Sequence, residues 1–149
     1  MANKEKYTVA ELRAELEAAG IRPTAQRIAI LGFMRENPVH PTAEVVFAAL
    51  SGEIGSLSLT TVYNTLKLLV EHGLVSMLTI DDTFKCFDGN VNMHAHLMCM
   101  ECKTIFDMPM PESVASFVEG LEDFEPKDVQ LYVKGICKKC KLNKEIVNH

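Results

Sequence analysis

Apolar residues in the first half of the chain recur at helical spacing in four successive segments. Thr8 and Glu11 match a capping box, and Leu12 and Leu16 follow at a spacing of four. The pattern therefore predicts a first helix that begins after Thr8 and ends at Gly20, a natural C-cap. Further helices are predicted over 24–36, 42–52 and 58–73, and the last two open with a predicted N-cap, Thr42 and Ser58.

The pattern changes after residue 73. The segments LVSMLTI and TFKCF are typical of two short strands, joined by a turn at Asp81 and Asp82. Several helices followed by such a hairpin is the order of a winged helix-turn-helix. The turn formers Asp88, Gly89 and Asn90 then predict a hinge. Beyond them HLMCM, TIFDM and VQLYVKGI are predicted to form strands, with a helix over about 112–121.

These elements predict an α+β chain of two domains. We expect a winged-helix domain over 1–87, a hinge over 88–93 and a second, smaller α/β domain over 94–149.

Composition narrows the class of protein. The chain has 149 residues and is 48% apolar, which predicts a packed core. The charged N-terminus has no apolar signal region, and the longest apolar run, VVFAAL, is far shorter than the roughly 18 residues of a membrane span. We therefore expect a soluble cytoplasmic protein without a membrane partner. A net charge of −5 argues against a protein that coats polyanions generally, but leaves room for a local DNA-reading face.

Four of the five cysteines form two CxxC pairs, Cys99 with Cys102 and Cys137 with Cys140. Each pair puts two thiolates on a tight knuckle, and two knuckles complete a tetrahedron. Four sulfur ligands leave no open position, so this pattern predicts a structural Zn²⁺ site that joins a strand pair to the C-terminal segment. Redox-active or simply buried thiols are the alternative reading. Cys86 has no partner in the sequence and is expected to face the core of the wing.

A second candidate site contains histidine and aspartate. His94 and His96 on one strand point to the same face, because strand side chains alternate. Such a pair is often a surface coincidence, but His40, Asp88 and Asp107 lie at chain breaks or strand ends that can converge on it. Three nitrogens and at least two oxygens suit Fe²⁺, Mn²⁺ or Zn²⁺.

The helix predicted over 58–73 carries a polar face opposite Val62, Leu66 and Leu69. We predict that it is the recognition helix, with Tyr63 and Asn64 entering a DNA groove. The alternative for Tyr63 is packing against another helix with its hydroxyl in water. The remaining residues of the polar face are Thr60, Thr61 and Lys67. Three arginines are predicted to contact phosphates, which position a protein without specifying sequence: Arg13, Arg22 and Arg27.

Taken together, several motifs resemble the ferric uptake regulator family, and within it most closely the peroxide-stress regulators. The resemblance covers almost the whole chain, through GIRPTAQRIAIL, HPTAEVVFAAL, SLTTVYNTLKLLVEHGLV, FDGNVNMHAHLMCMECKTIFDM and the closing CKKC. It implies a homodimeric, metal-dependent repressor whose C-terminal domain dimerises. It also implies a structural zinc site at the four paired cysteines, and a regulatory metal site at His40, Asp88, His94, His96 and Asp107.

The resemblance also implies how such a repressor would respond. Iron-uptake members usually carry glutamate at the position of Asp88, so this aspartate favours peroxide sensing by oxidation of His40 or His94. Because the ligands come from both sides of the hinge, metal binding is expected to set the angle between the domains. A two-fold dimer would then read two half-sites of a palindromic operator.

Three other functions are compatible with parts of this pattern. The same ligands suit a sensor of iron, manganese or zinc supply without peroxide chemistry. A small metallohydrolase would need a general base beside bound water, and no HExxH motif supplies one, so we expect no enzyme activity. A zinc-stapled protein-interaction module predicts no DNA affinity under any metal condition.

Overall fold

The computed structural model describes residues 7–37 and 39–147 and divides into two compact units, Met1–Val91 and Asn92–His149. The division falls within the segment for which a hinge is predicted, 88–93. Across the described parts of the chain, no helix is long and apolar enough to cross a membrane.

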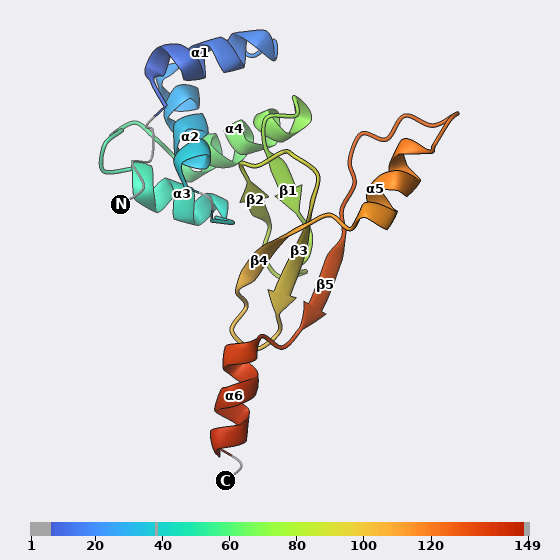
Figure 1. Cartoon of the computed structure of the whole chain (residues 1–149). Coiled ribbons are helices and arrows are strands. Elements are labelled where there is room, and N and C mark those ends of the chain that lie inside the picture. The colour runs from blue at the N-terminus through green and yellow to red at the C-terminus, as the bar shows by residue number, and fades with distance from the viewer. Residues whose placement is uncertain (1–6, 38, 148–149) are drawn as a thin grey trace. The chain divides into compact units, whose positions relative to one another are not determined.

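The first unit consists of four helices followed by a two-stranded antiparallel sheet (Figure 1). At each of these helix starts the capping side chain accepts a hydrogen bond from the backbone N–H three residues later, as predicted for all of them but Thr24. These caps are Thr8, Thr24, Thr42 and Ser58. The helices are α1 (Val9–Ala18), α2 (Ala25–Glu36), α3 (Ala43–Leu50) and α4 (Leu59–Glu71), and the strands of the wing are β1 (Ser76–Leu78) and β2 (Cys86–Asp88).

The core of the first unit is formed by the apolar stripes of all four helices. Leu16, Ile30, Val46 and Leu66 come one from each helix and are each 0% exposed. Phe87 on β2 joins the same cluster, so the wing is anchored to the helices. Burial of these stripes is the main contribution to the stability of this unit.

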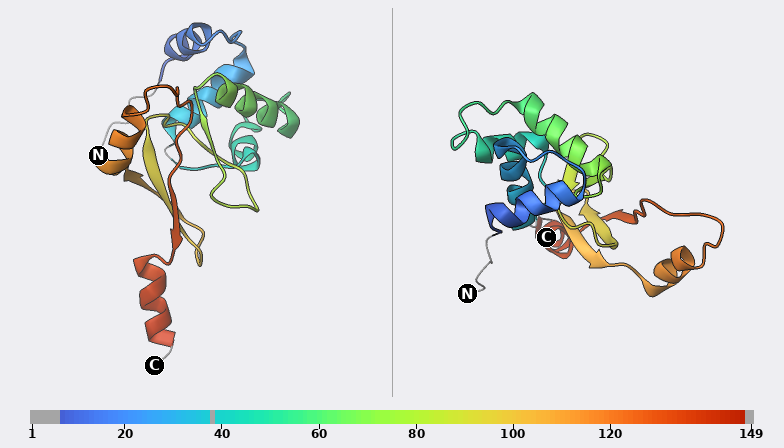
Figure 2. Two further views of the ribbon diagram at one scale, coloured as in Figure 1. Left: turned by 90° about the vertical axis from the view of Figure 1, so that its right-hand side faces the viewer. Right: turned by 90° about the horizontal axis from the view of Figure 1, so that it is seen from above.

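The second unit is a three-stranded sheet with the strand order β4-β3-β5. The central β3 pairs antiparallel with β4 and parallel with β5 (Figures 1 and 2). The C-terminal helix α6 extends from the end of this sheet (Figure 1). The elements are β3 (His94–Cys99), β4 (Ile105–Pro109), α5 (Glu112–Glu119), β5 (Tyr132–Gly135) and α6 (Lys138–Val147). The sequence pattern did not predict α6, and the strands that it predicted at β1 and β5 are longer than those observed.

The register of the second sheet separates polar from apolar side chains. His96 lies beside Asp107 on β4 and beside Tyr132 on β5. One residue further, Leu97 lies between Phe106 and Val133. Because strand side chains alternate, one face carries the polar row and the opposite face carries the apolar row.

The structure corrects the predicted start of the hinge. Asp88 is the last residue of β2 and is only 3% exposed, so it is not a solvated turn residue. Gly89 packs so closely on α2 that a Cβ added there would meet the carbonyl oxygen of Met34 at 2.2 Å. These two residues therefore belong to the first unit, which continues to Val91.

Candidate metal centres and DNA-binding face

The four paired cysteines converge, as predicted, at one end of the second sheet. Cys99 ends β3, Cys102 lies in the turn to β4, and Cys137 and Cys140 open α6. Their sulfur atoms lie within 4.8 Å of one another, and Cys102 Sγ is 3.9 Å from Cys137 Sγ. Zn–S bonds of about 2.3 Å place tetrahedral sulfurs about 3.8 Å apart, so the cluster fits a zinc ion.

The surroundings of the sulfurs favour thiolates at two of the four positions. The backbone N–H of Cys137 donates to Cys99 Sγ over 3.3 Å, and this bond is the main reason that the pKa of Cys99 falls to about 6. Thr104 Oγ1 lies 3.2 Å from Cys102 Sγ and lowers the pKa of that thiol. The neighbouring Cys137 thiol raises the pKa of Cys140 to about 12. Metal binding must therefore displace a proton from Cys140.

Cys86 belongs to the first unit and is buried in β2, as predicted. Burial, with a smaller contribution from the charge of Asp81, raises the pKa of its thiol. A protonated, buried thiol reacts slowly, so Cys86 is suited to packing rather than to redox chemistry.

His94 and His96 share a face of β3, as predicted, and their rings lie 4.4 Å apart between centroids. Asp107 Oδ1 on β4 lies 3.4 Å from His94 Nε2 and 3.3 Å from His96 Nε2. The register explains this approach, because His96 and Asp107 are direct partners across the strands. His94 Nδ1 lies 2.5 Å from the carbonyl oxygen of Asn92, which can only accept a hydrogen bond. His94 Nδ1 therefore carries the proton, and Nε2 offers its lone pair on the side of Asp107.

His40 and Asp88 form a second pair, within the first unit. His40 Nε2 lies 3.5 Å from Asp88 Oδ2, and both side chains are nearly buried. The two residues are held together by a backbone bond between their neighbours, in which Phe87 N–H donates to Pro41 O over 2.9 Å. Asp88 Oδ1 accepts the N–H of Asn90, which leaves Oδ2 directed at the imidazole.

Arg35 supports the backbone just after Asp88, a role that the sequence analysis missed. Its Nη1 donates to the carbonyl of Gly89 over 2.6 Å, and its Nη2 pairs with Glu15 at 2.7 Å. The Arg35 side chain is 10% exposed. An arginine at the end of a helix normally indicates only a favourable interaction with the helix dipole, so no sequence signal identified this contact.

The spacing of the donor atoms in these two groups can be compared with that around a metal ion. At metal–donor distances of about 2.1 Å, neighbouring donor atoms lie about 3.0 Å apart in octahedral geometry and about 3.4 Å apart in tetrahedral geometry. The separations of 3.3, 3.4 and 3.5 Å within the two groups are close to these values. Imidazole nitrogen and carboxylate oxygen suit Fe²⁺, Mn²⁺ or Zn²⁺. Each group therefore has donors of the type and spacing that bind a divalent metal ion.

The exposed face of α4 carries most of the residues predicted to contact DNA. Val62, Leu66 and Leu69 are each 0% exposed, which confirms the predicted inner face. On the outer face four of the predicted side chains are exposed: Thr60, Tyr63, Asn64 and Lys67. Thr61 is only half-exposed, and its hydroxyl lies 2.9 Å from that of Ser58 at the helix cap.

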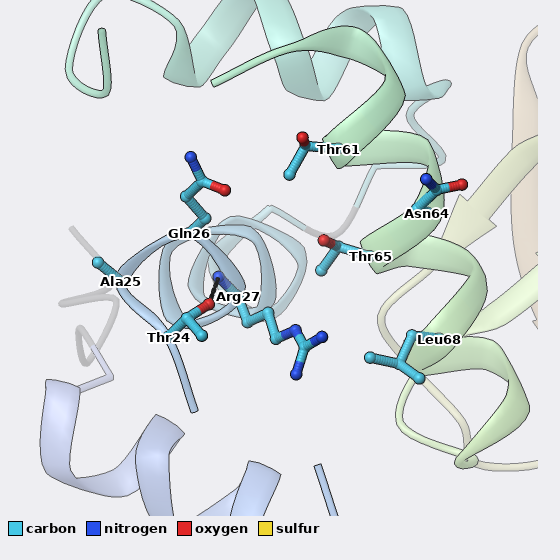
Figure 3. Close-up of a pocket in the computed structure, with 8 residues that line it drawn as sticks. All are labelled: Thr24, Ala25, Gln26, Arg27, Thr61, Asn64, Thr65 and Leu68. Atoms are coloured by element: carbon cyan, nitrogen blue, oxygen red, sulfur yellow. Dashed lines mark hydrogen bonds between the residues drawn. The ribbon is translucent and has the colours of Figure 1, made fainter. Parts of the chain in front are cut away.

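A pocket separates the start of α2 from α4 (Figure 3). The Arg27 side chain extends from α2 towards α4, and its Nη1 donates to the carbonyl of Arg22 over 2.9 Å. Asn64 and Thr65 line the opposite wall, and Thr65 is buried. Arg13 and Arg22 are exposed. The pocket therefore has side chains of both helices in its walls, with Gln26 and Arg27 on α2 and Asn64 on α4 as its larger polar groups.

Lys85, on the loop of the wing before β2, was also missed. Its Nζ donates to the hydroxyl of Tyr63 over 3.1 Å. The sequence shows a basic residue in the hairpin, but a contact across 22 residues depends on how the wing folds against α4.

Three comparisons identify the relatives of this chain. A model of the ferric uptake regulator family matches residues 18–134. The chain is 34% identical over 137 residues to the peroxide-responsive repressor PerR of Staphylococcus aureus, which covers 91% of this chain and 93% of that protein. The manganese-bound ferric uptake regulator of Pseudomonas aeruginosa superposes with a TM-score of 0.72 at 26% identity, over 85% of this chain and 97% of that one.

A second solved relative is PerR from Streptococcus pyogenes, described in connection with peroxide sensing and gene regulation. It is 30% identical, with a TM-score of 0.50 over 94% of this chain and 98% of that one. The predicted fold class, helices followed by a small sheet domain, is confirmed by these matches. The chain thus belongs to the ferric uptake regulator family, whose members are metal-dependent, DNA-binding transcriptional regulators that act as dimers, and not enzymes.

Proposed function

We propose that the chain is a homodimeric repressor that binds a palindromic operator when a regulatory metal is bound, and releases it after oxidation by hydrogen peroxide. The observation that carries this proposal is the pair of ligand groups: His40 with Asp88 in the first unit, and His94 and His96 with Asp107 in the second. Each group alone supplies too few donors for a tight octahedral site. One ion bound by all five side chains would satisfy both groups.

Shared ligation provides the link between metal and DNA. A metal ion that needs donors from both units stabilises those arrangements of the units in which all five donors reach it. The recognition helices of a dimer read two half-sites only at one separation. Metal binding therefore raises operator affinity, and loss of a ligand lowers it.

Two features support peroxide as the signal. Relatives at 34% and 30% identity are named as peroxide-responsive or described in connection with peroxide sensing. The carboxylate in the first ligand group is that of Asp88, where the resemblance to iron-uptake regulators would favour glutamate. Bound Fe²⁺ would supply electrons to hydrogen peroxide, and the oxidant so produced would add oxygen to a ligand imidazole.

Exposure favours two of the three histidines as targets. The side chains of His94 and His40 are 12% and 9% exposed, and that of His96 is only 2% exposed. Peroxide that diffuses in from solvent would therefore reach a bound Fe²⁺ more readily from the side of the first two imidazoles. An oxidised imidazole is a weaker donor, so the ion leaves and the operator is released.

We further propose that the homodimer buries the apolar face of the second sheet. Phe106 and Val133 flank Leu97 on that face, and they are 41% and 51% exposed in the single chain. Such a contiguous apolar row is costly in water and is typical of a subunit interface. Phe106→Glu should give monomers on a sizing column, with zinc content unchanged.

The decisive experiment compares the zinc-replete protein loaded with Fe²⁺ and with Mn²⁺. A duplex is first selected from random DNA with the Mn²⁺-loaded protein, and binding to it is measured before and after peroxide. We expect the Fe²⁺ form to lose binding and to gain oxygen on a peptide containing His40 or His94, and the Mn²⁺ form to keep binding. The same assay with Cys86→Ser removes the thiol outside the zinc cluster as a source of the response.

Two results would contradict parts of this proposal. Equal loss of binding in both metal forms, or oxygen found only on cysteine, indicates a thiol mechanism. Metal-dependent binding without any response to peroxide indicates a sensor of metal supply.

The DNA-binding face is tested separately. Tyr63→Ala should weaken binding to the selected duplex in a protein that keeps its zinc content and its dimeric state.

A further inference from the structure

The contact between Lys85 and Tyr63 joins the wing to the outer face of α4. Lys85 Nζ lies 3.1 Å from the Tyr63 hydroxyl and 5.7 Å from the centre of its ring. Both side chains are exposed, Tyr63 by 37%. The two distances place the ammonium group beyond the hydroxyl, near the edge of the ring, so the two groups form a hydrogen-bonded pair at the surface rather than a buried structural link.

The chemistry of this pair determines whether the Tyr63 hydroxyl can donate or accept a further hydrogen bond. An ammonium group has three donors and no acceptor, whereas a phenol is both donor and acceptor. Lys85 therefore occupies a lone pair of the Tyr63 oxygen, and the hydroxyl proton cannot point back at the lysine. Tyr63 is left as a donor, and it needs an acceptor outside the pair.

We propose that Lys85 is a positioning residue that makes Tyr63 read a hydrogen-bond acceptor on a base edge in the major groove of the operator. This inference rests on the proposed function, because it assumes that α4 is the recognition helix. The acceptors that DNA presents there are guanine N7 and O6, adenine N7 and thymine O4. The amino groups of cytosine and adenine only donate, so the pair discriminates against them at the contacted position.

The position of Tyr63 favours a base edge over a phosphate. It lies five residues after the cap Ser58, within the N-terminal half of α4, and residues near the start of a recognition helix contact bases. The ammonium charge of Lys85 attracts any nearby phosphate as well, and such an attraction is independent of sequence. A role confined to phosphate is therefore the alternative that an experiment must separate.

The test uses the zinc-replete, Mn²⁺-loaded dimer and two duplexes: one selected from random DNA with the wild-type protein, and a scrambled version of equal composition. Affinities are measured for wild type, Tyr63→Phe, Lys85→Met, the double variant and Lys85→Arg. Tyr63→Phe removes only the hydroxyl, and Lys85→Met removes the charge and the donor at similar length. Zinc content and the circular dichroism spectrum check that each variant folds.

We expect either single substitution to lower the ratio of selected to scrambled affinity about three- to tenfold, the effect of one hydrogen bond. The double variant should lower this ratio no further than the larger single change, because the two residues act on one contact. Lys85→Arg should retain most of the ratio, since it keeps the charge and an N–H donor.

Two outcomes would overturn the inference. In the first, Lys85→Met lowers the affinity for both duplexes equally, and its fold-change multiplies with that of Tyr63→Phe in the double variant. Lys85 would then contact only phosphate. In the second, Lys85→Met leaves the affinity for both duplexes unchanged, and Lys85 then has no role in DNA binding. Failure of the wild type to select or retain any duplex is a different result, because it rejects the proposed function itself.

Discussion

The two units differ in how they bury apolar side chains. In the first unit, buried residues come from all four helices and the wing, and form one cluster. In the described part of the second unit, the buried residues all lie on β3: Ala95, His96, Met98 and Cys99. Helix α5 buries none of its residues, and Phe117 on it is 68% exposed.

This difference indicates two sources of stability. The first unit has the layered apolar core of an independently folding domain. The second has too little buried surface for its size and resembles small domains that depend on a metal or on oligomerisation. Zinc binding and dimerisation therefore stabilise the second unit, and changes that remove them should damage it selectively.

The largest effect is expected from Cys99→Ser. Three sulfurs hold zinc poorly, and structural zinc contributes an apparent binding free energy of about 10–16 kcal/mol in small zinc domains. We expect loss of zinc, loss of the dimer on a sizing column, and proteolysis confined to residues after 91. Cys86→Ser is the matched control and should keep both zinc and dimer. Stoichiometric zinc in a normal Cys99→Ser dimer would refute the assignment.

Next in size is Leu66→Ala, in the core of the first unit. Leu66 is 0% exposed, so truncation should lower the free energy of unfolding by about 2–5 kcal/mol through lost burial and a cavity. Denaturant unfolding measures this change, and zinc content should stay the same. Leu142→Ala on α6 is the control, because Leu142 is 49% exposed and should change stability by less than about 0.5 kcal/mol. An equal loss of unfolding free energy in both variants would contradict the difference in apolar burial between the two units.

A smaller effect is expected from Gly89→Ala, next to Asp88. The added Cβ would meet Met34 O at 2.2 Å, which forces a backbone shift at a cost of about 1–3 kcal/mol. The shift should also displace Asp88 and weaken Mn²⁺ binding in a titration. Gly55→Ala has open space around its Cβ and should leave Mn²⁺ binding unchanged. Normal binding in both variants would show that Asp88 is not held by this packing.

The smallest change is a gain, from Lys103→Gly in the turn after Cys102. Lys103 has a φ of 63°, in the left-handed region where a side chain costs about 1–2 kcal/mol. Glycine should therefore raise the stability of the zinc-loaded second unit by about 1 kcal/mol, measured as a higher melting temperature. Lys141→Gly in α6 should act in the opposite direction, because glycine weakens a helix interior by a similar amount. A loss of stability in Lys103→Gly would contradict this account.

Prediction from sequence succeeded where the physical signal is local. Thr8 with Glu11 formed the expected capping box, and Ser58 capped α4. The alternation along β3 correctly placed His94 and His96 on one face. Each of these features depends on residues within one turn or one strand, so nearby sequence contains the necessary information.

Prediction failed where the signal is weak or depends on distant partners. Helix α6 begins directly after Cys137, but its apolar residues Leu142 and Ile146 are exposed, so no buried stripe marks it in the sequence. Asp88 was expected in a solvated hinge because Asp, Gly and Asn favour turns. Pairing with β1 and the Arg35 contact to Gly89 instead placed this segment within the first unit.

The sequence by itself therefore determined the order of helices and strands from α1 to β5, the two CxxC knuckles and the types of metal ligand, because these follow from short-range periodicity and spacing. Tertiary structure alone decided which groups meet: Asp107 with two imidazoles, Asp88 with His40, and Lys85 with Tyr63. Such contacts depend on strand register and on packing between elements far apart in the chain. A shift of the strand register by one residue gives every side chain a different cross-strand neighbour. Only the folded sheet and core therefore specify these contacts.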